Sequence, residues 1–167
     1  TDLVRCWGSD HMQHVSTAPK DVAFSAIASG TFHSCGVVKG TGLVQCWGQN
    51  VEKQVSGVPK GVAFSSVSCG YFHSCGIVNN GSGLVECWGL SELVKGVPKG
   101  VAFSSVSCAV HHTCGIVNNG SGLVQCWALP DATNLRGAKE RMNLRRSTQR
   151  GRRATEEREA SPKLGSE

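Results

Sequence analysis

The chain has 167 residues, of which 40% are hydrophobic, 6% aromatic and 17% charged, and its net charge is +5. This length is typical of one domain. No apolar run approaches the roughly 18 residues of a membrane-spanning helix, which excludes such a span in this chain. The 21 glycines favour short turns and short β-strands over long helices. Residues 137–167 hold nine Lys and Arg against five Asp and Glu, so +4 of the charge lies there and the remainder of the chain is nearly neutral.

An internal repeat of about 40 residues organises residues 1–130. The segment Gly57–Cys69 is identical to Gly96–Cys108, and three short markers recur in phase with it. The markers are Cys-Trp at Cys6-Trp7, Cys46-Trp47, Cys87-Trp88 and Cys126-Trp127, His-x-Cys at His33/Cys35, His73/Cys75 and His112/Cys114, and Val-Ala-Phe ending at Phe24, Phe64 and Phe103. The predicted units are residues 1–29 (partial), 30–69, 70–108 and 109–130 (partial).

Each unit is predicted to form β-strands throughout. In the third unit and the residues before it, Val62–Cys69, His73–Val78 and Leu84–Trp88 are short apolar runs separated by Gly or Pro-Lys-Gly. A weaker stretch such as Asn50–Ser56 is assigned to a fourth, outer strand. Four short strands in about 40 residues are typical of a β-propeller blade, so the prediction is an all-β partial propeller.

Hairpin turns predict which cysteines pair. The turn Asn79–Gly83 supplies the glycine and asparagine that a tight connection needs, and pairing about Gly81 places Cys75 opposite Cys87. Directly opposed residues lie about 4.5 to 5.5 Å apart at Cα, within reach of a disulfide. The same arithmetic predicts the disulfides Cys35–Cys46 and Cys114–Cys126.

Three cysteines have no predicted partner. The strand that should pair with Cys6 would lie before residue 1, which points to a truncated chain. Cys69 and Cys108 occupy a position that is Ser29 in the first unit, so they stand outside the repeated pairing.

The paired markers resemble the regulator of chromosome condensation repeat, over about residues 1–128. The segments that carry the resemblance are Gly30–Gly36, Gly42–Gly48, Gly70–Gly76 and Gly83–Gly89. It implies a seven-bladed propeller with four-stranded blades, of which this chain supplies about half. Two departures are Glu52–Val55 in place of Gly-Gln-Leu-Gly, and Ala128 after the last tryptophan. The paired cysteines are similar to cysteine-rich variants in the extracellular parts of some plant receptor kinases and in some bacterial or algal secreted proteins.

The resemblance also implies structural roles for the repeated histidines and glycines, with each imidazole bonding backbone between blades. These residues are His33, His73 and His112, and Gly36, Gly76 and Gly115. The alternative for His-x-Cys is a zinc site, but with the opposing cysteine it offers three ligands where a closed structural site takes four. We therefore predict no metal and no cofactor. His11, His14 and His111 do not recur in register and are assigned to the surface.

No catalytic motif stands out. A repeated Cys/His dyad argues for scaffold, because catalysis needs one site with a base and an orienting group. The tryptophans Trp7, Trp47, Trp88 and Trp127 have two readings, a stacking platform for bases or sugars and packing between blades; one per blade favours packing. The chain is therefore predicted not to be an enzyme.

The functional hypothesis is a non-enzymatic protein-binding module, part of a larger secreted or ectodomain protein, with rim loops as the contact surface. The candidate loops are Lys39–Thr41, Asn79–Ser82 and Asn118–Ser121. One alternative is an intracellular, nuclear or cytoplasmic, regulator of a small GTPase or chromatin-associated protein, against which the paired cysteines argue. Another is a truncated inactive product. Residues 131–167 form a basic low-complexity tail, predicted to be disordered or marginally helical, and no nucleic acid is expected to bind outside it.

Overall fold

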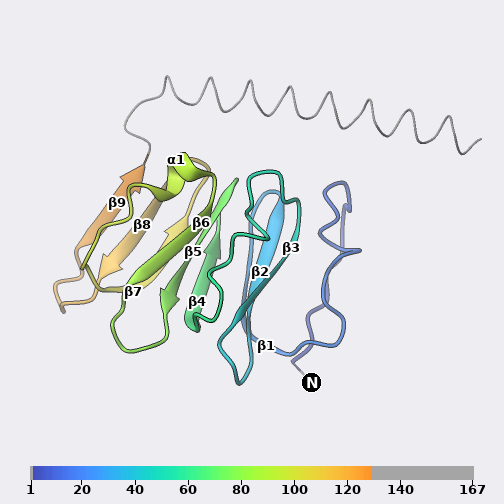
Figure 1. Ribbon diagram of the computed structural model, residues 1–167, viewed down its shortest axis with the longest axis horizontal. Helices are drawn as coiled ribbons and strands as arrows, with labels where there is room; N and C mark the ends of the chain where they lie inside the picture. Colours follow the sequence, from blue (N-terminus) through green and yellow to red (C-terminus); the bar gives the residue numbers. More distant parts are fainter. Residues whose placement is uncertain (1, 129–167) are drawn as a thin grey trace, which may run out of the picture. The chain divides into compact units, whose positions relative to one another are not determined.

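The computed structural model describes residues 2–128, which form nine β-strands and one short helix (Figure 1). The strands make three antiparallel sheets of three strands each, in chain order. Sheet 1 contains β1 (Phe24–Ser29), β2 (His33–Val38) and β3 (Val44–Gly48). Sheet 2 contains β4 (Phe64–Cys69), β5 (His73–Val78) and β6 (Val85–Gly89). Sheet 3 contains β7 (Phe103–Cys108), β8 (His112–Val117) and β9 (Val124–Ala128), and α1 (Ser91–Val94) lies between sheets 2 and 3 in the chain.

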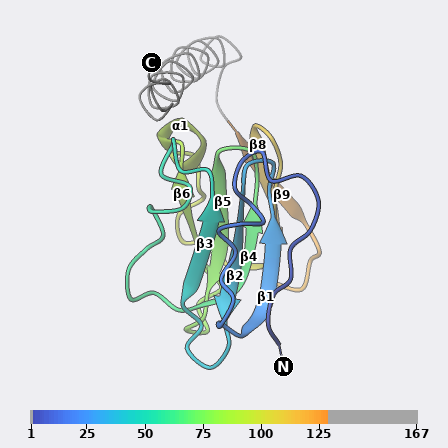
Figure 2. The same cartoon turned by 90° about the vertical axis from the view of Figure 1, so that its right-hand side faces the viewer.

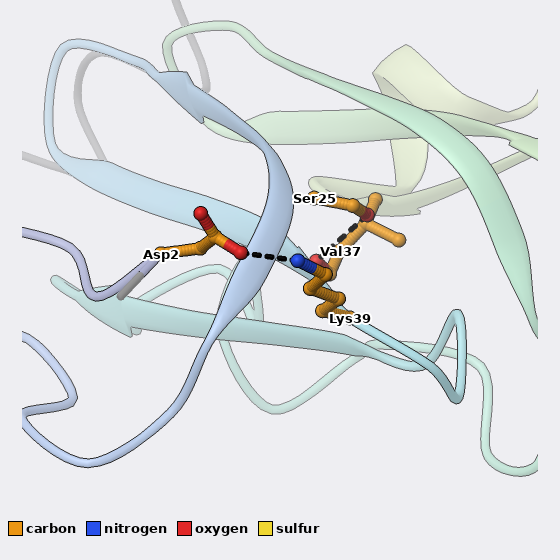
Figure 3. A network of polar contacts seen from close by, with 4 residues as sticks. All are labelled: Asp2, Ser25, Val37 and Lys39. Atoms are coloured by element: carbon orange, nitrogen blue, oxygen red, sulfur yellow. Dashed lines mark hydrogen bonds and ion pairs between the residues drawn. The ribbon is translucent and has the colours of Figure 1, made fainter.

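The three sheets repeat one register. In each, the cysteines of the second and third strands are direct cross-strand partners, as Cys75 is to Cys87. The first strand of each sheet begins with an irregularity after its phenylalanine. At that point a serine hydroxyl donates to a carbonyl of the second strand, Ser25 to Val37 in sheet 1 at 3.3 Å (Figure 3). Ser65 and Ser104 repeat the contact, so the bulge belongs to the repeat itself.

The sheets stack face to face, and the core lies between them (Figures 1 and 2). Figure 2 looks along the stack from the side of sheet 1. The cysteine face of sheet 1 packs on Phe64, Cys69 and Trp88 of sheet 2. The cysteine face of sheet 2 packs in the same way on Phe103 and Trp127 of sheet 3. Alternation along each strand therefore gives every sheet one disulfide face and one aromatic face.

The prediction of a fourth, outer strand in each blade is wrong for the described residues. Residues 50–56, expected to be extended, lie in a series of turns. The Asn50 side chain accepts the backbone N–H groups of Val55 and Ser56 at 3.0 and 2.9 Å, and Lys53 has a φ of 62°, both incompatible with a strand. Within residues 2–128 each sheet therefore has three strands where the sequence analysis expected four.

The chain divides into two units, Thr1–Leu129 and Pro130–Glu167. The second unit, to which the basic tail belongs, lies outside the described residues. In the described part, no helix has the length and apolar character that crossing a membrane requires.

Candidate functional site

The six hairpin cysteines are joined in the three pairs that the turn arithmetic placed opposite one another. The disulfides are Cys35–Cys46, Cys75–Cys87 and Cys114–Cys126, each with a Cα–Cα distance of 4.0 Å. Each one closes its hairpin near the middle of the ladder. In sheets 1 and 2 one cysteine of each pair, Cys35 or Cys75, is fully inaccessible, and its partner is half-buried.

A buried cluster of polar side chains lies where sheet 1 meets sheet 2. His33 Nε2 lies 2.6 Å from the Oγ of Ser74, which comes from the facing sheet. The same hydroxyl lies 3.7 Å from Cys35 Sγ and donates to Cys69 Sγ at 3.4 Å. One hydroxyl therefore bridges a histidine, a disulfide sulfur and a free thiol. We call these four residues the first polar cluster.

The interface of sheets 2 and 3 holds a second polar cluster of the same design. His73 Nε2 lies 2.8 Å from Thr113 Oγ1, and that hydroxyl lies 3.8 Å from Cys75 Sγ and donates to Cys108 Sγ at 3.6 Å. Cys69 and Cys108, left without partners by the sequence analysis, are free thiols that face the His-x-Cys strand of the preceding sheet. Their recurrence at the end of the first strand was the signal for this placement.

Burial sets the charge state of both clusters. It lowers the pKa of His33 and of His73 to about 4, so both imidazoles are neutral at physiological pH. Burial raises the pKa of the Cys69 thiol to about 12 and raises that of Cys108 as well. A neutral thiol with a raised pKa is a poor nucleophile, so in the disulfide-bonded chain the clusters connect sheets and offer no reactive group.

The repeated histidines need two corrections. Where the resemblance implied that each imidazole bonds backbone, His33 and His73 bond a side-chain hydroxyl of the next sheet. His112 occupies the same repeat position but is exposed, because residues 2–128 contain no further sheet to cover it. The repeated glycines lie under aromatic rings: a Cβ at Gly36, Gly76 or Gly115 would approach Phe24, Phe64 or Phe103 within 2.4 to 2.5 Å.

Three of the repeated tryptophans are buried and one is exposed. Trp47, Trp88 and Trp127 are buried, each against the phenylalanine of its own sheet at ring distances of 5.4 to 5.8 Å. Trp7 is 87% exposed, which corrects the expectation that it packs between blades.

Two residues in the segments before sheets 1 and 2 bond the tryptophans. The sequence analysis assigned His14 to the surface and Gln54 to a strand. The indole N–H of Trp47 donates to the His14 carbonyl at 3.0 Å, and that of Trp88 donates to the Gln54 carbonyl at 3.1 Å. The residues that replaced the family's Gly-Gln-Leu-Gly segment therefore still hold the next sheet in place.

The candidate rim loops join the second and third strands of each sheet, and Figure 1 shows the β2–β3 loop at the lower end of sheet 1. Their polar side chains are used within the turns. Asn80 Oδ1 accepts the Ser82 N–H at 3.0 Å, and Ser82 Oγ accepts the Leu84 N–H at 3.2 Å. Asn119 and Ser121 repeat both bonds. In sheet 1, Lys39 instead pairs with Asp2 (Figure 3).

One repeated surface feature escaped the sequence analysis. A leucine stands one glycine after each rim loop and stays 40–64% exposed, while the valine after it turns toward the disulfide face. The members of this leucine row are Leu43, Leu84 and Leu123, with Leu3 at the equivalent position before sheet 1. The signal was present in the recurring Leu-Val pair, because strand alternation sends the two side chains to opposite faces.

The comparisons with known proteins agree with this architecture. The family model described as "Regulator of chromosome condensation (RCC1) repeat" matches residues 24–54 and 64–92. The entire ectodomain of the receptor kinase CR4 from Physcomitrella patens is 34% identical, with a TM-score of 0.66, over 75% of this chain and 33% of that one. The CRINKLY WD40 ectodomain of the Arabidopsis thaliana receptor kinase ACR4 is 32% identical, with a TM-score of 0.67, over 77% and 44%.

Yeast RCC1 (Prp20), solved bound to Kap60, is 17% identical with a TM-score of 0.57, over 73% of this chain and 38% of that one, and shares the fold. A search of curated proteins gave no match. The chain spans 33–44% of the length of these three solved structures. Its three sheets are blades of a partial β-propeller, and the first two of them match the regulator of chromosome condensation repeat, in a cysteine-rich form with a disulfide across each hairpin.

Proposed function

We propose that the array is a non-enzymatic module that binds another protein through the leucine row and the adjoining rim loops. The observation that carries the proposal is the row itself, one exposed leucine at the same position of each consecutive repeat. Single exposed apolar residues are ordinary on a protein surface. A leucine that recurs in phase, and recurs exposed, offers a partner a series of equivalent apolar contacts.

The backbone holds the row rigidly. The carbonyl of Gly42, next to Leu43, accepts the N–H of Phe64 in the following sheet at 2.7 Å. Gly83 and Phe103 repeat this bond at 2.7 Å, and Asp2 and Phe24 make it at 3.1 Å. The spacing of the leucines is thereby tied to the spacing of the blades. A preformed surface of this kind loses little conformational entropy on binding.

The chemistry of the rim favours a protein over a nucleic acid or a sugar. The side chains of Asn80 and Ser82 in the second loop, and of Asn119 and Ser121 in the third, already accept hydrogen bonds within their own turns, whereas the leucines stay free for a partner. The described repeats are close to neutral, which gives no field to attract phosphates. Apolar side chains with a polar rim are the usual make-up of a protein interface.

Three disulfides and the likeness to two receptor kinase ectodomains support an extracellular or ectodomain setting, since structural disulfides persist in oxidising compartments. The resemblance to yeast RCC1 is at 17% identity and extends to the fold, so the intracellular regulator gains no support from it.

The test compares three immobilised proteins for capture of secreted and cell-surface proteins, quantified by mass spectrometry. They are the wild-type chain, Leu43→Ser with Leu84→Ser, and a control with Ile27→Ser and Val110→Ser, whose side chains are also exposed but lie off the row. We expect partners held by the wild type and the control to fall by about tenfold on the leucine variant. Equal retention by all three proteins would refute the leucine row as the binding surface.

A further inference from the structure

We propose that reduction of the disulfides in sheets 1 and 2 converts the two polar clusters into binding sites for a divalent ion of the zinc type. Each site would take three cysteine sulfurs and one imidazole nitrogen, which is a common ligand set of structural zinc. The ligands are His33, Cys35, Cys46 and Cys69 in the first site and His73, Cys75, Cys87 and Cys108 in the second. The inference is independent of the protein-binding role.

The ligand atoms converge on one point in each cluster. In the first, the histidine nitrogen and the sulfurs of Cys35 and Cys69 lie within 4.8 Å of one another. All three surround the Ser74 hydroxyl, at 2.6, 3.7 and 3.4 Å. Thr113 is surrounded in the same way, at 2.8, 3.8 and 3.6 Å. The hydroxyl oxygen thus marks a position that is close to all three ligand atoms. A metal ion at this position would bind them after small side-chain rotations.

The facing sheet supplies the ligand that the sequence analysis lacked. His-x-Cys and the opposing cysteine give three ligands on one sheet, one short of a closed tetrahedral site. Cys69 brings a further thiol from sheet 2 to the cluster on sheet 1, and Cys108 does the same from sheet 3 to sheet 2. Cys46 is bonded to Cys35 and becomes available when that bond is reduced. A filled site would therefore connect two neighbouring blades through one ion.

The chemistry balances with a dithiol as reductant. The dithiol gives two electrons and two protons to the S–S bond, becomes a cyclic disulfide, and leaves two cysteine thiols in the protein. When the divalent ion binds, these two thiols and the third cysteine release three protons to water, and the metal keeps its oxidation state. The disulfide and the bound ion use the same sulfurs, so the two forms exclude each other.

The hydroxyl at the centre of each cluster makes a specific prediction. Ser74 occupies the point of convergence in the oxidised chain, so its side chain must turn away before an ion can enter. Ser74→Ala vacates that point while keeping all four ligands. We therefore expect this variant to bind metal at the first site more tightly than the wild type.

The number of sites is also fixed. Sheet 3 has His112, Cys114 and Cys126, but residues 2–128 include no later cysteine that could complete a third set. Cys6 lies outside both clusters and is a matched control, being a free cysteine like Cys69 and Cys108. The reduced chain is expected to bind two ions.

The experiment is a titration of the full reduced chain, freed of dithiol without oxygen, first with Co(II) and then with Zn(II). Tetrahedral thiolate-bound Co(II) is followed by its visible absorption, and the fold by circular dichroism. We expect two Co(II) per chain, displaced by Zn(II), in the wild type and in Cys6→Ser. One is expected in Cys69→Ser or Cys108→Ser, and none in the double variant.

Several results would overturn the proposal. One is a reduced wild-type chain that binds no Co(II), whether it stays folded or not. Another is a double variant, Cys69→Ser with Cys108→Ser, that still binds two ions. A third is equal loss from Cys6→Ser and Cys69→Ser, which would show that an unfolded, cysteine-rich chain chelates the metal without a built site.

Discussion

Asp10 and Asn50 hold equivalent loops in consecutive repeats, one with a carboxylate and the other with an amide. Asp10 Oδ1 accepts the N–H groups of Val15 and Ser16 at 2.8 and 3.1 Å. Asn50 Oδ1 accepts those of Val55 and Ser56 at 3.0 and 2.9 Å. Hydrogen bonds from Ser16, through its side chain and its backbone, and then from Val15 hold the pKa of Asp10 below its ordinary 3.8.

The carboxylate makes the first of these loops sensitive to acid. Because the folded pKa is depressed, the stabilisation is complete above about pH 3.8, the unfolded value, and is lost as the pH falls through the lower folded pKa. Amide chemical shifts and hydrogen exchange of Val15 and Ser16 should report this loss, while those of Val55 and Ser56 stay constant. Asp10→Asn should abolish the response, and acid sensitivity that survives this change would place its origin elsewhere.

Local chemistry decided which residue-level features the sequence could predict. The pairing of Cys75 with Cys87 followed from one turn and the period of a strand, both of which lie within 13 consecutive residues. The contact of His33 with Ser74 spans 41 residues and depends on how two sheets stack, which no local pattern encodes. The role of Cys69 was missed for the same reason.

At the scale of the strand, the glycine of the His-x-Cys-Gly marker is a packing device. Gly76 lies in the middle of β5, and the ring of Phe64 from β4 covers it so closely that a Cβ would meet Cδ1 at 2.5 Å. Because Gly76 has no side chain, the ring of Phe64 can lie close against the backbone of β5. The same ring packs on the disulfide face of sheet 1. Sequence comparison within the repeats located this glycine, and the structure supplied the reason for it.

Gly76→Ala should destabilise the fold by about 1–3 kcal/mol through overpacking, measured by denaturant unfolding. Phe64→Leu removes the ring edge that the new methyl group meets, so the two changes should be less than additive in a double-mutant cycle. Strict additivity would mean that the methyl group is accommodated without touching the ring.

Residues 50–56 were predicted to form an outer strand, and their side chains show why they form turns instead. Residues 50–56 carry valines at strand-like spacing, but Asn50 captures two backbone donors and Lys53 takes a positive φ. The segment then wraps so that the Gln54 carbonyl accepts the indole N–H of Trp88. A side chain that bonds the backbone five and six residues ahead outweighs a weak β pattern, and the prediction of an outer strand gave no weight to it.

Over the three sheets as a set, burial of the repeated disulfide face is uneven. Sheets 1 and 2 have theirs covered by the aromatic face of the next sheet. The corresponding face of sheet 3 is open within residues 2–128: Val124 is 63% exposed, and Cys126 is exposed as well. Similar local sequences thus have different environments, because the repeat predicts the blade while the neighbouring blades decide how far it is buried.

This unevenness predicts the order in which the disulfides are reduced under native conditions. Attack by a thiolate requires access to a sulfur, so Cys114–Cys126, with its exposed Cys126, should open first. Cys35–Cys46 and Cys75–Cys87 should open more slowly, because one cysteine of each is buried and the other half-buried. Limited treatment with a dithiol, alkylation and peptide mapping would give the order. In denaturant the three bonds should be reduced at similar rates, since each closes a loop of nearly equal length. Equal rates under native conditions would contradict protection by the stacked sheets, because solvent access is then the one property in which the three hairpins differ strongly.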